Sequence, residues 1–488
     1  MKKATTMIVT IFLVLGLTAC NIVNLYTDIY DARSEVIELK LWHYYTAKAR
    51  EVFERQVRLY NETEGMEAGV KVVPTYFTQL KKIEEEALKV LIDNKFVQEM
   101  PDLLAIMPMS AFELYQHDKI ANLSEYTSVL EREEFVPAFL EDGMFDDNMY
   151  LYPYSRAVYL LYLNKTDWLK LKSETEIEDE HLATWQGIFE AAEVYYNWTD
   201  AKTPERYDGK AFISDINLPA FIASGNLQQG VTFLNKGSEI SVHLDESAFR
   251  NIWDIYYGLV SLGYLESYAR LGGDNVRLGK SLAYVSSSSN SEQFPVETFL
   301  SRDEIYEIDM EVFLYPTFDL DKRISLQIGT SFAVVKSTEE REKLAVDFLR
   351  WLTKNDSQVE LMLETGYMTV KQEAFDDDLL INAIQGVRSL SKNNENKALR
   401  IEKSYEQVNI YTVVSVDTFA GSNVITTEIS NALFEISKQG REEVLRLVEK
   451  GLSPQEAFNR TDPDGKFAQW IDVSKDILKR HNVIYKLE

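Results

Sequence analysis

From residue 36 onward the chain alternates between strand-like and helical patterns, and this alternation restricts the folds open to it. Residues 36–42 alternate apolar and polar side chains with the period of a strand, and residues 49–60 carry apolar side chains at helical spacing. Residues 69–77 return to a β-branched composition, a helical pattern covers 80–98, and a short apolar strand follows at 103–107. Strands separated by helices predict an α/β fold with mostly parallel sheets and helices on both faces.

Later segments extend this pattern. Residues 150–164 are rich in Tyr, Val and Leu, and we interpret them as an extended crossing between two parts of the molecule. Residues 337–340 match a capping box before a helix with one apolar face, and Gly366 is expected to end the helix after that. From 376 to 488 the pattern is mostly helical.

Charge and cysteine content exclude several classes of partner. The chain has 488 residues, with 78 acidic and 51 basic side chains, so its formal net charge is −27. The negative electrostatic field of such a chain repels phosphate backbones, and we expect no nucleic-acid partner. One cysteine permits no internal disulfide or thiolate cluster, and none of the five histidines form a helical ligand pair. We therefore expect no metal and no cofactor.

The N-terminus has the pattern of a secretory signal. Lys2 and Lys3 precede an apolar run, Met7 to Leu17, which is short for a bilayer span. The next residues, Leu-Thr-Ala-Cys ending at Cys20, resemble the lipobox of bacterial lipoproteins, in which this cysteine becomes lipidated. The alternative is a chance cysteine after an ordinary signal peptide or short anchor, but Cys20 is the only cysteine in the chain, which favours the lipobox.

On this interpretation residues 1–19 are a lipoprotein signal peptide and residues 20–35 are the lipidated cysteine and a tether. No later segment approaches eighteen consecutive apolar residues. We expect a monomer that is anchored by lipid alone on the extracytoplasmic face of the cell membrane, and any transport role must be completed by another protein.

Several stretches, taken in order, resemble the family 1 extracellular solute-binding proteins of ABC importers, a group that includes sugar-binding lipoproteins. The similarity covers residues 36 to 375, and beyond that it rests on the helical pattern only. The stretches are Leu39 to Trp42, Pro101 to Leu104, Tyr152-Pro153-Tyr154, Leu161 to Lys165, Thr184-Trp185, Ala223 to Asn226, Gly329 to Val334, Ala345 to Leu352 and Gly366-Tyr367.

This resemblance implies a two-lobed, periplasmic-binding-protein-like (type II) fold with a helical C-terminal region. Lobe one would combine residues 36–148 with 311–367, and lobe two residues 151–308 with 368–488. The chain crossings would fall near 147–152, 308–312 and 366–370. The greater length and the acidity of this chain depart from the common form of the family and put the identity of the ligand in doubt.

Candidate ligand contacts lie where predicted strands end, because ligands of open α/β sheets collect outside the carboxyl ends of strands. The first such loop holds Trp42, His43, Tyr44 and Tyr45. An aromatic ring can cover the C–H face of a sugar, while the sugar hydroxyls need polar partners. The remaining candidates come from a strand end, from the expected hinge and from the resemblance: Ser110, Tyr154, Arg156, Gly225, Asn226, Ser286, Ser287, Thr330, Ser331 and Phe419.

Each candidate could instead have an ordinary structural role that involves no ligand. Trp42 and the two tyrosines fit core packing as well as ligand contact. For His43 an ordinary polar role is favoured, because no metal set or nearby Asp and Ser accompanies it. Ser110 fits better as the N-cap of the next helix. Ser286 and Ser287 also suit a flexible serine-rich loop.

These features predict a binding protein that captures a sugar or oligosaccharide in an interlobe cleft and delivers it to the permease subunits of an ABC importer. We expect no enzymatic activity. An envelope-anchored glycoside hydrolase is the alternative from another class, and it requires two carboxylates facing each other across the scissile bond. A receptor that feeds a sensor kinase through the same fold is a third hypothesis, which the sequence does not separate from the first.

Overall fold

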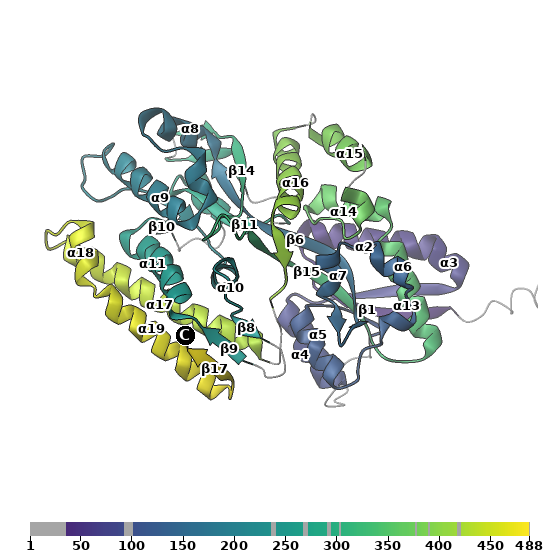
Figure 1. Cartoon of the computed structure of the whole chain (residues 1–488). Helices are drawn as coiled ribbons and strands as arrows, with labels where there is room; N and C mark the ends of the chain where they lie inside the picture. Colours follow the sequence, from purple (N-terminus) through teal and green to yellow (C-terminus); the bar gives the residue numbers. More distant parts are fainter. Residues whose placement is uncertain are drawn as a thin grey trace, which may run out of the picture.

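The structure is a computed structural model that describes residues 36–91, 101–235, 241–266, 272–289, 294–301, 304–375, 378–388, 391–416 and 421–487 (Figure 1). The predicted signal peptide, Cys20 and the tether lie outside the described residues, and so does Phe419. No helix within the described ranges is both long and apolar enough to cross a bilayer.

A ten-stranded mixed sheet runs through the molecule in the order β10-β7-β11-β6-β15-β3-β1-β2, with β14 beside β6 and β16 beside β15. The strands are β1 (Ile37–His43), β2 (Val70–Tyr76), β3 (Leu103–Ile106), β6 (Leu151–Asn164), β7 (Ala211–Ser214), β10 (Leu265–Glu266), β11 (Ser281–Ser287), β14 (Met310–Leu314), β15 (Ile324–Val334) and β16 (Thr412–Val414).

The expected parallel pairing occurs at both ends of this sheet, and its centre is antiparallel. At one end β1 pairs in parallel with β2 and β3, and at the other β7 pairs in parallel with β10 and β11. The long strands β6 and β15 run antiparallel to each other and pass from one half of the molecule into the other. The first half of β6 pairs with β15, and the second half lies between β11 and β14.

The crossing of β6 and β15 is closely packed. All 14 residues of β6 are buried, including Pro153, which lies beside a register shift between Thr330 and Ser331 of β15. Gly329 adopts a φ of 154°, and a Cβ there would collide with the carbonyl oxygen of Ser155. Only glycine therefore fits at this point of the crossing.

Helices cover both faces of the sheet (Figure 1). We call the half of the molecule that contains β1, β2 and β3 the β1 half, and the half that contains β7, β10 and β11 the β7 half. In the β1 half, Leu39 and Leu41 pack against Val52 and Phe53 of α2. In the β7 half, the largest core cluster joins strand residues to helices α9, α10, α11, α17 and α19, with Trp253 stacked on neighbouring aromatic rings. The helices are α2 (Ala47–Glu62), α3 (Glu64–Ala68), α4 (Leu80–Leu91), α5 (Pro108–Gln116), α6 (Val129–Glu133), α7 (Pro137–Glu141), α8 (Lys165–Glu174), α9 (Trp185–Asp200), α10 (Leu218–Gln228), α11 (Glu246–Leu262), α12 (Gly272–Arg277), α13 (Glu339–Leu352), α14 (Asn355–Thr365), α15 (Asp378–Arg388), α16 (Lys392–Ile410), α17 (Ser422–Val448), α18 (Pro454–Arg460) and α19 (Pro463–Arg480).

Short strands complete the fold. They are β4 (Met144–Phe145), β5 (Asn148–Met149), β8 (Leu234–Asn235), β9 (Ser241–Leu244), β12 (Glu297–Phe299), β13 (Ile305–Glu307) and β17 (Ile484–Leu487). The mostly helical C-terminal region predicted from the sequence is present, and it also contains β16 and β17, which the helical pattern did not reveal.

Two local predictions need correction. The N-cap of α13 is Thr338, whose hydroxyl accepts a bond from the Arg341 amide, so the helix begins one residue later than the predicted capping box. The structure also differs near 308–312, where a crossing was expected. There β14 pairs with the second half of β6, and the chain returns along β15 instead. Gly366 does end α14, with a φ of 77°.

Candidate functional site

A cavity of about 290 Å³ lies between the two halves of the molecule. One wall is α7 with the residues that follow it, and the opposite wall is α10 with residues 232–234. The start of β15 and the end of β16 close the cavity between these walls. The lining residues are Ala138, Glu141, Asp142, Phe145, Ala223, Leu227, Thr232, Phe233, Leu234, Ile324, Val414, Ser415 and Val416.

The lining combines apolar surface with a few oxygen atoms. Phe145 and Phe233 supply aromatic rings, Glu141 and Asp142 supply carboxylates, and Ser415 supplies a hydroxyl. Predominantly apolar walls with a few placed polar groups are typical of small-molecule sites. Within the described ranges, no lysine, arginine or histidine lines this cavity.

Asp142 is held by a buried arginine. The Arg156 side chain is fully buried at the crossing of β6 and β15, and one terminal nitrogen, Nη2, donates to Asp142 Oδ2 at 3.3 Å and to Ser331 Oγ at 2.7 Å. Burial lowers the pKa of Arg156, and the Asp142 carboxylate opposes this by raising it. Asp142 thus faces the cavity as the partner of a cation that lies behind the wall.

Gln327 of β15 makes a second link to the cavity wall. Its Nε2 donates to Ser415 Oγ at 2.8 Å and to the carbonyl oxygen of Ala138 in α7. The side chain is buried, and its Oε1 has no hydrogen-bond partner among the described residues.

The loop after β1 lies at the same crossing. The Tyr44 hydroxyl shares a hydrogen bond of 2.7 Å with Thr330 Oγ1, and burial raises the pKa of Tyr44 well above its ordinary value. Tyr45 stacks beside Tyr44 and packs against Phe53 and Tyr154 in the core. Of the predicted site residues, the structure therefore brings Tyr44, Thr330, Arg156 and Ser331 together.

Trp42 and His43 lie on opposite faces of β1. Trp42 packs on Phe77 at a centroid distance of 5.0 Å, in the cluster beneath α4 and α5. His43 packs on Phe53 with no exposed surface, and neither ring nitrogen has a hydrogen-bond partner among the described residues. Burial lowers the pKa of His43 to about 4. Trp42 occupies the core position that is the alternative to ligand contact, whereas the ordinary polar role favoured for His43 is wrong, because His43 is fully buried.

Ser110 and Tyr154 also bond within the protein. Met107, not Ser110, is the N-cap of α5, so the capping interpretation of Ser110 is wrong. Its hydroxyl instead donates to Glu84 of α4, and burial raises the pKa of that carboxyl. Tyr154 donates to Gln56 Oε1 at 3.0 Å.

The candidates from the β7 half occupy α10 and the end of β11. Gly225 packs beneath the Phe318 ring, which a Cβ would meet at 2.8 Å. Asn226 donates to the carbonyl oxygen of Ile222 within α10. Ser286 and Ser287 end β11 rather than forming a loop, and Ser287 shares a hydrogen bond with Ser289. None of the predicted contacts among the described residues lines the 290 Å³ cavity.

A second cavity of about 200 Å³ lies at the other end of α10. Asp215 follows β7 with a φ of 56°, and burial raises the pKa of its carboxyl. The remaining lining residues are Ile216, Leu218, Pro219, Tyr256, Leu265, Glu266, Ser430, Asn431 and Phe434. In the described part of the chain, no group of three or more His, Cys, Asp or Glu residues could hold a metal ion.

None of the described residues that line the 290 Å³ cavity was predicted as a ligand contact from the sequence; they come from residues 138–145, α10, residues 232–234, the start of β15 and residues 414–416. One signal for α7 was present, since Pro137 at the first helical position and Gly143 after Asp142 bracket a short helix. No comparable signal marks residues 414–416.

Two α/β halves joined by long crossing strands, with a cavity between them, define the class of two-lobed binding proteins. A model of the bacterial extracellular solute-binding protein family matches residues 60–385, well over half of the chain. The chain belongs to this family of binding proteins, whose members act outside the cytoplasm. No match was found among curated protein sequences.

Solved structures with the same fold come from several bacteria. UgpB from Mycobacterium tuberculosis in complex with glycerophosphocholine is 16% identical with a TM-score of 0.67, and the match covers 91% of this chain and 99% of UgpB. The cyclic alpha-maltosyl-1,6-maltose binding protein from Arthrobacter globiformis is 15% identical with a TM-score of 0.63, covering 90% and 99% of the two chains. Lmo0181 from Listeria monocytogenes in complex with cycloalternan is 12% identical with a TM-score of 0.63, covering 92% and 99%. These matches confirm the periplasmic-binding-protein-like fold predicted from the sequence.

Proposed function

We propose that this protein captures a carbohydrate in the cavity between α7 and α10 and delivers it to the permease subunits of an ABC importer. The observation that carries the proposal is the composition of that cavity, where aromatic and aliphatic side chains alternate with the oxygens of Glu141, Asp142, Thr232 and Ser415. Rings such as Phe145 suit the C–H face of a sugar, and carboxylates accept from its hydroxyls. One structural neighbour was solved in complex with cycloalternan and another is named as a binding protein for cyclic alpha-maltosyl-1,6-maltose, and both support this ligand class.

The charge of the cavity restricts the class of ligand that we propose. Among the described residues, two carboxylates and no basic side chain line it, within a chain of net charge −27. An anionic ligand would enter without a countercharge, and burying an unpaired charge costs several kcal/mol. The ligand we propose is therefore a neutral sugar, or one that carries an amino group.

The second cavity lies at the other end of the same helix. Helix α10 contributes Leu218 to the 200 Å³ cavity and Leu227 to the 290 Å³ cavity. At 1.5 Å per residue these positions are about 13.5 Å apart along the helix. Because α10 is almost wholly buried between them, we place the proposed sugar in the 290 Å³ cavity alone.

We further propose that Cys20 anchors the protein by lipid to the outer face of the cell membrane. The support is the sequence motif Leu-Thr-Ala-Cys after an apolar segment. The predicted lobes, residues 36–148 with 311–367 and 151–308 with 368–488, are also part of this proposal, except that the second crossing follows β15 instead of lying near 308–312.

The geometry of the carboxylates favours binding over hydrolysis. Glu141 and Asp142 are adjacent in sequence at the end of α7, on one side of the cavity, and Asp142 is already paired with Arg156. A glycoside hydrolase needs two carboxyl groups that flank the scissile bond.

A thermal-shift panel on residues 21–488 tests the proposal. Neutral oligosaccharides should raise the melting temperature in proportion to the logarithm of their concentration. Peptides or metal ions that raise it, with no response to a broad sugar panel, would overturn the carbohydrate assignment.

A further inference from the structure

One guanidinium joins three segments at the crossing. Arg156 Nη1 donates to the carbonyl oxygens of Ser155 in β6 and Thr330 in β15, at 3.1 and 3.0 Å. Its Nη2 donates to the carbonyl oxygen of Phe139 in α7 at 3.2 Å, in addition to Ser331 and Asp142. Both crossing strands and α7 are therefore fixed to the same planar, fully buried group.

Gln327 repeats this connection from β15. It bonds the carbonyl oxygen of Ala138, which precedes Phe139 in α7, and it also bonds Ser415, which lines the same cavity just after β16. A helix of five residues is marginal by itself, so α7 depends on such tertiary contacts for its position. The buried side chains of Arg156 in β6 and Gln327 in β15 supply these contacts.

Helix α7 is also the wall of the cavity that bears its carboxylates. Arg156 is a predicted ligand contact, but its donors point to β6, β15 and α7, and it does not line the cavity. Arg156 is therefore placed to affect the ligand through the residues of α7 and Asp142 that it bonds, not by direct contact.

We propose that Arg156 and Gln327 are positioning residues that hold α7 on the crossing of β6 and β15, so that ligand binding at Asp142 is coupled to the relative position of the two halves. This inference rests on the proposed function for the identity of the ligand. The attachment of α7 itself can be measured without any ligand.

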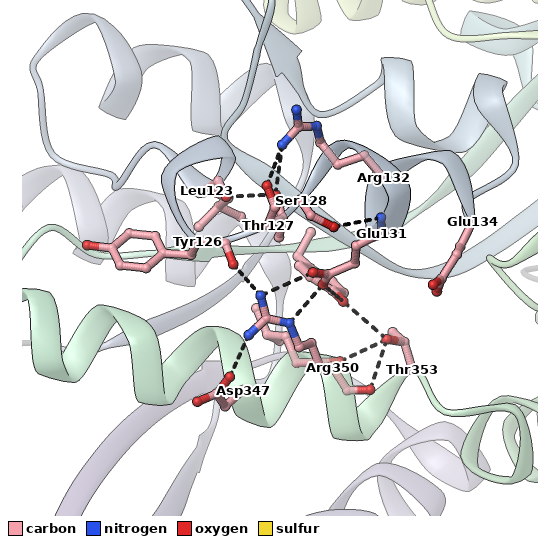
Figure 2. Close-up of polar contacts among 12 residues, drawn as sticks. Leu123, Tyr126, Thr127, Ser128, Glu131, Arg132, Glu134, Asp347, Arg350 and Thr353 are labelled. Carbon is pink, nitrogen blue, oxygen red and sulfur yellow. Dashed lines mark hydrogen bonds and ion pairs between the residues drawn. The ribbon is translucent and has the colours of Figure 1, made fainter.

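The test compares Arg156→Lys and Gln327→Met with a matched control, Arg350→Lys. A lysine keeps the charge of Arg156 but lacks the planar fork that reaches several acceptors. Arg350 makes a similar network in which it bonds both oxygens of Glu131, Asp347 and the backbone of Tyr126 (Figure 2). That network joins α13 to α6 and includes no residue that lines the cavity.

Hydrogen exchange of the ligand-free protein gives the first readout. The Leu140 amide, which donates to the carbonyl oxygen of Val136, the N-cap of α7, should exchange about tenfold faster in both test variants and at the wild-type rate in Arg350→Lys. If Arg156→Lys does not fold, Gln327→Met still decides the question. Wild-type exchange in α7 in the folded variants would overturn the proposal.

Affinity gives the second readout, measured by calorimetry with the oligosaccharide that most raises the melting temperature of the wild type. We expect Arg156→Lys to lose about tenfold in affinity, and to lose little further when Asp142→Asn is already present. Unchanged affinity, or fully additive losses, would show a purely structural role and overturn the proposal. If no sugar binds the wild type, the proposed function fails, while the exchange rates still decide how α7 is held.

Discussion

Tyr44 and Thr330 lie 286 residues apart in the chain and share a hydrogen bond of 2.7 Å between their hydroxyl groups. The bond joins the loop after β1 to the part of β15 that crosses β6. The first predicted ligand loop is therefore attached to the crossing between the two halves.

Removing this bond should destabilise the protein modestly. Tyr44→Phe leaves the buried Thr330 hydroxyl without its tyrosine partner, and we expect the free energy of unfolding to fall by about 1 kcal/mol. Urea denaturation measures the change, with the exposed Tyr207→Phe as control. Equal stability of the two variants would show that the bond contributes nothing.

The neighbouring carboxylates Glu141 and Asp142 should differ strongly in their effect on stability. Asp142→Asn leaves the fully buried Arg156 without its countercharge, and we expect a loss of about 3 kcal/mol. Glu141 is exposed, so Glu141→Gln should change stability by less than about 0.5 kcal/mol. Chemical denaturation of both variants at neutral pH checks this contrast, and similar losses in the two would contradict it.

His43 should make the protein less stable in acid. Because burial lowers its pKa to about 4 in the folded state, between pH 6.5 and 4 the unfolded chain binds a proton that the folded protein does not. Stability is therefore lost as the pH falls through this window, by up to about 3 kcal/mol from this residue.

The variant His43→Phe should flatten that dependence, since its ring suits the aromatic surroundings of Phe53 and Tyr76. Urea midpoints between pH 4 and 7 measure the slope. Replacement of the exposed His117 by Gln is the control and should leave the slope as in the wild type.

Acidic sugars should bind more weakly than their neutral parents. Because the described residues line the cavity with Glu141 and Asp142 and with no basic side chain, a uronate or phosphate group should lower affinity by about tenfold or more. Calorimetry on a matched neutral and acidic pair measures the ratio. Tighter binding of the acidic sugar would contradict the assigned cavity.

Lipid attachment at Cys20 should determine where the protein is found. In cells that express the full chain, labelled palmitate should enter the wild type and not Cys20→Ser, and the variant should leave the membrane fraction. Labelling of Cys20→Ser at the wild-type level would exclude the predicted lipobox.

The sequence predicts the fold better than the site. The alternation in residues 36–42 identifies β1, and the tyrosine-rich segment after Pro153 lies in the crossing strand β6. Strands as short as β16, with three residues, carry no measurable period, so they are found only through their pairing with β15.

The cavity could not be predicted because it joins segments that are distant in the chain. Asp142, Leu227 and Ser415 meet only after β6 and β15 have crossed. Trp42 is an example of a residue that was predicted to contact the ligand, because it ends a strand, but lies in the core. Whether α4 and α5 cover that face of β1 is decided by tertiary packing, not by local pattern.

The central claim is that a sugar binds between α7 and α10, and a crystal structure of the protein purified without refolding, grown with the best oligosaccharide of the panel, tests it most directly. We predict density for an intact sugar in the 290 Å³ cavity, with a ring against Phe145 or Phe233 and a hydroxyl bonded to Asp142. An empty cavity with the sugar bound elsewhere, or a cleaved sugar in the cavity, would contradict the account.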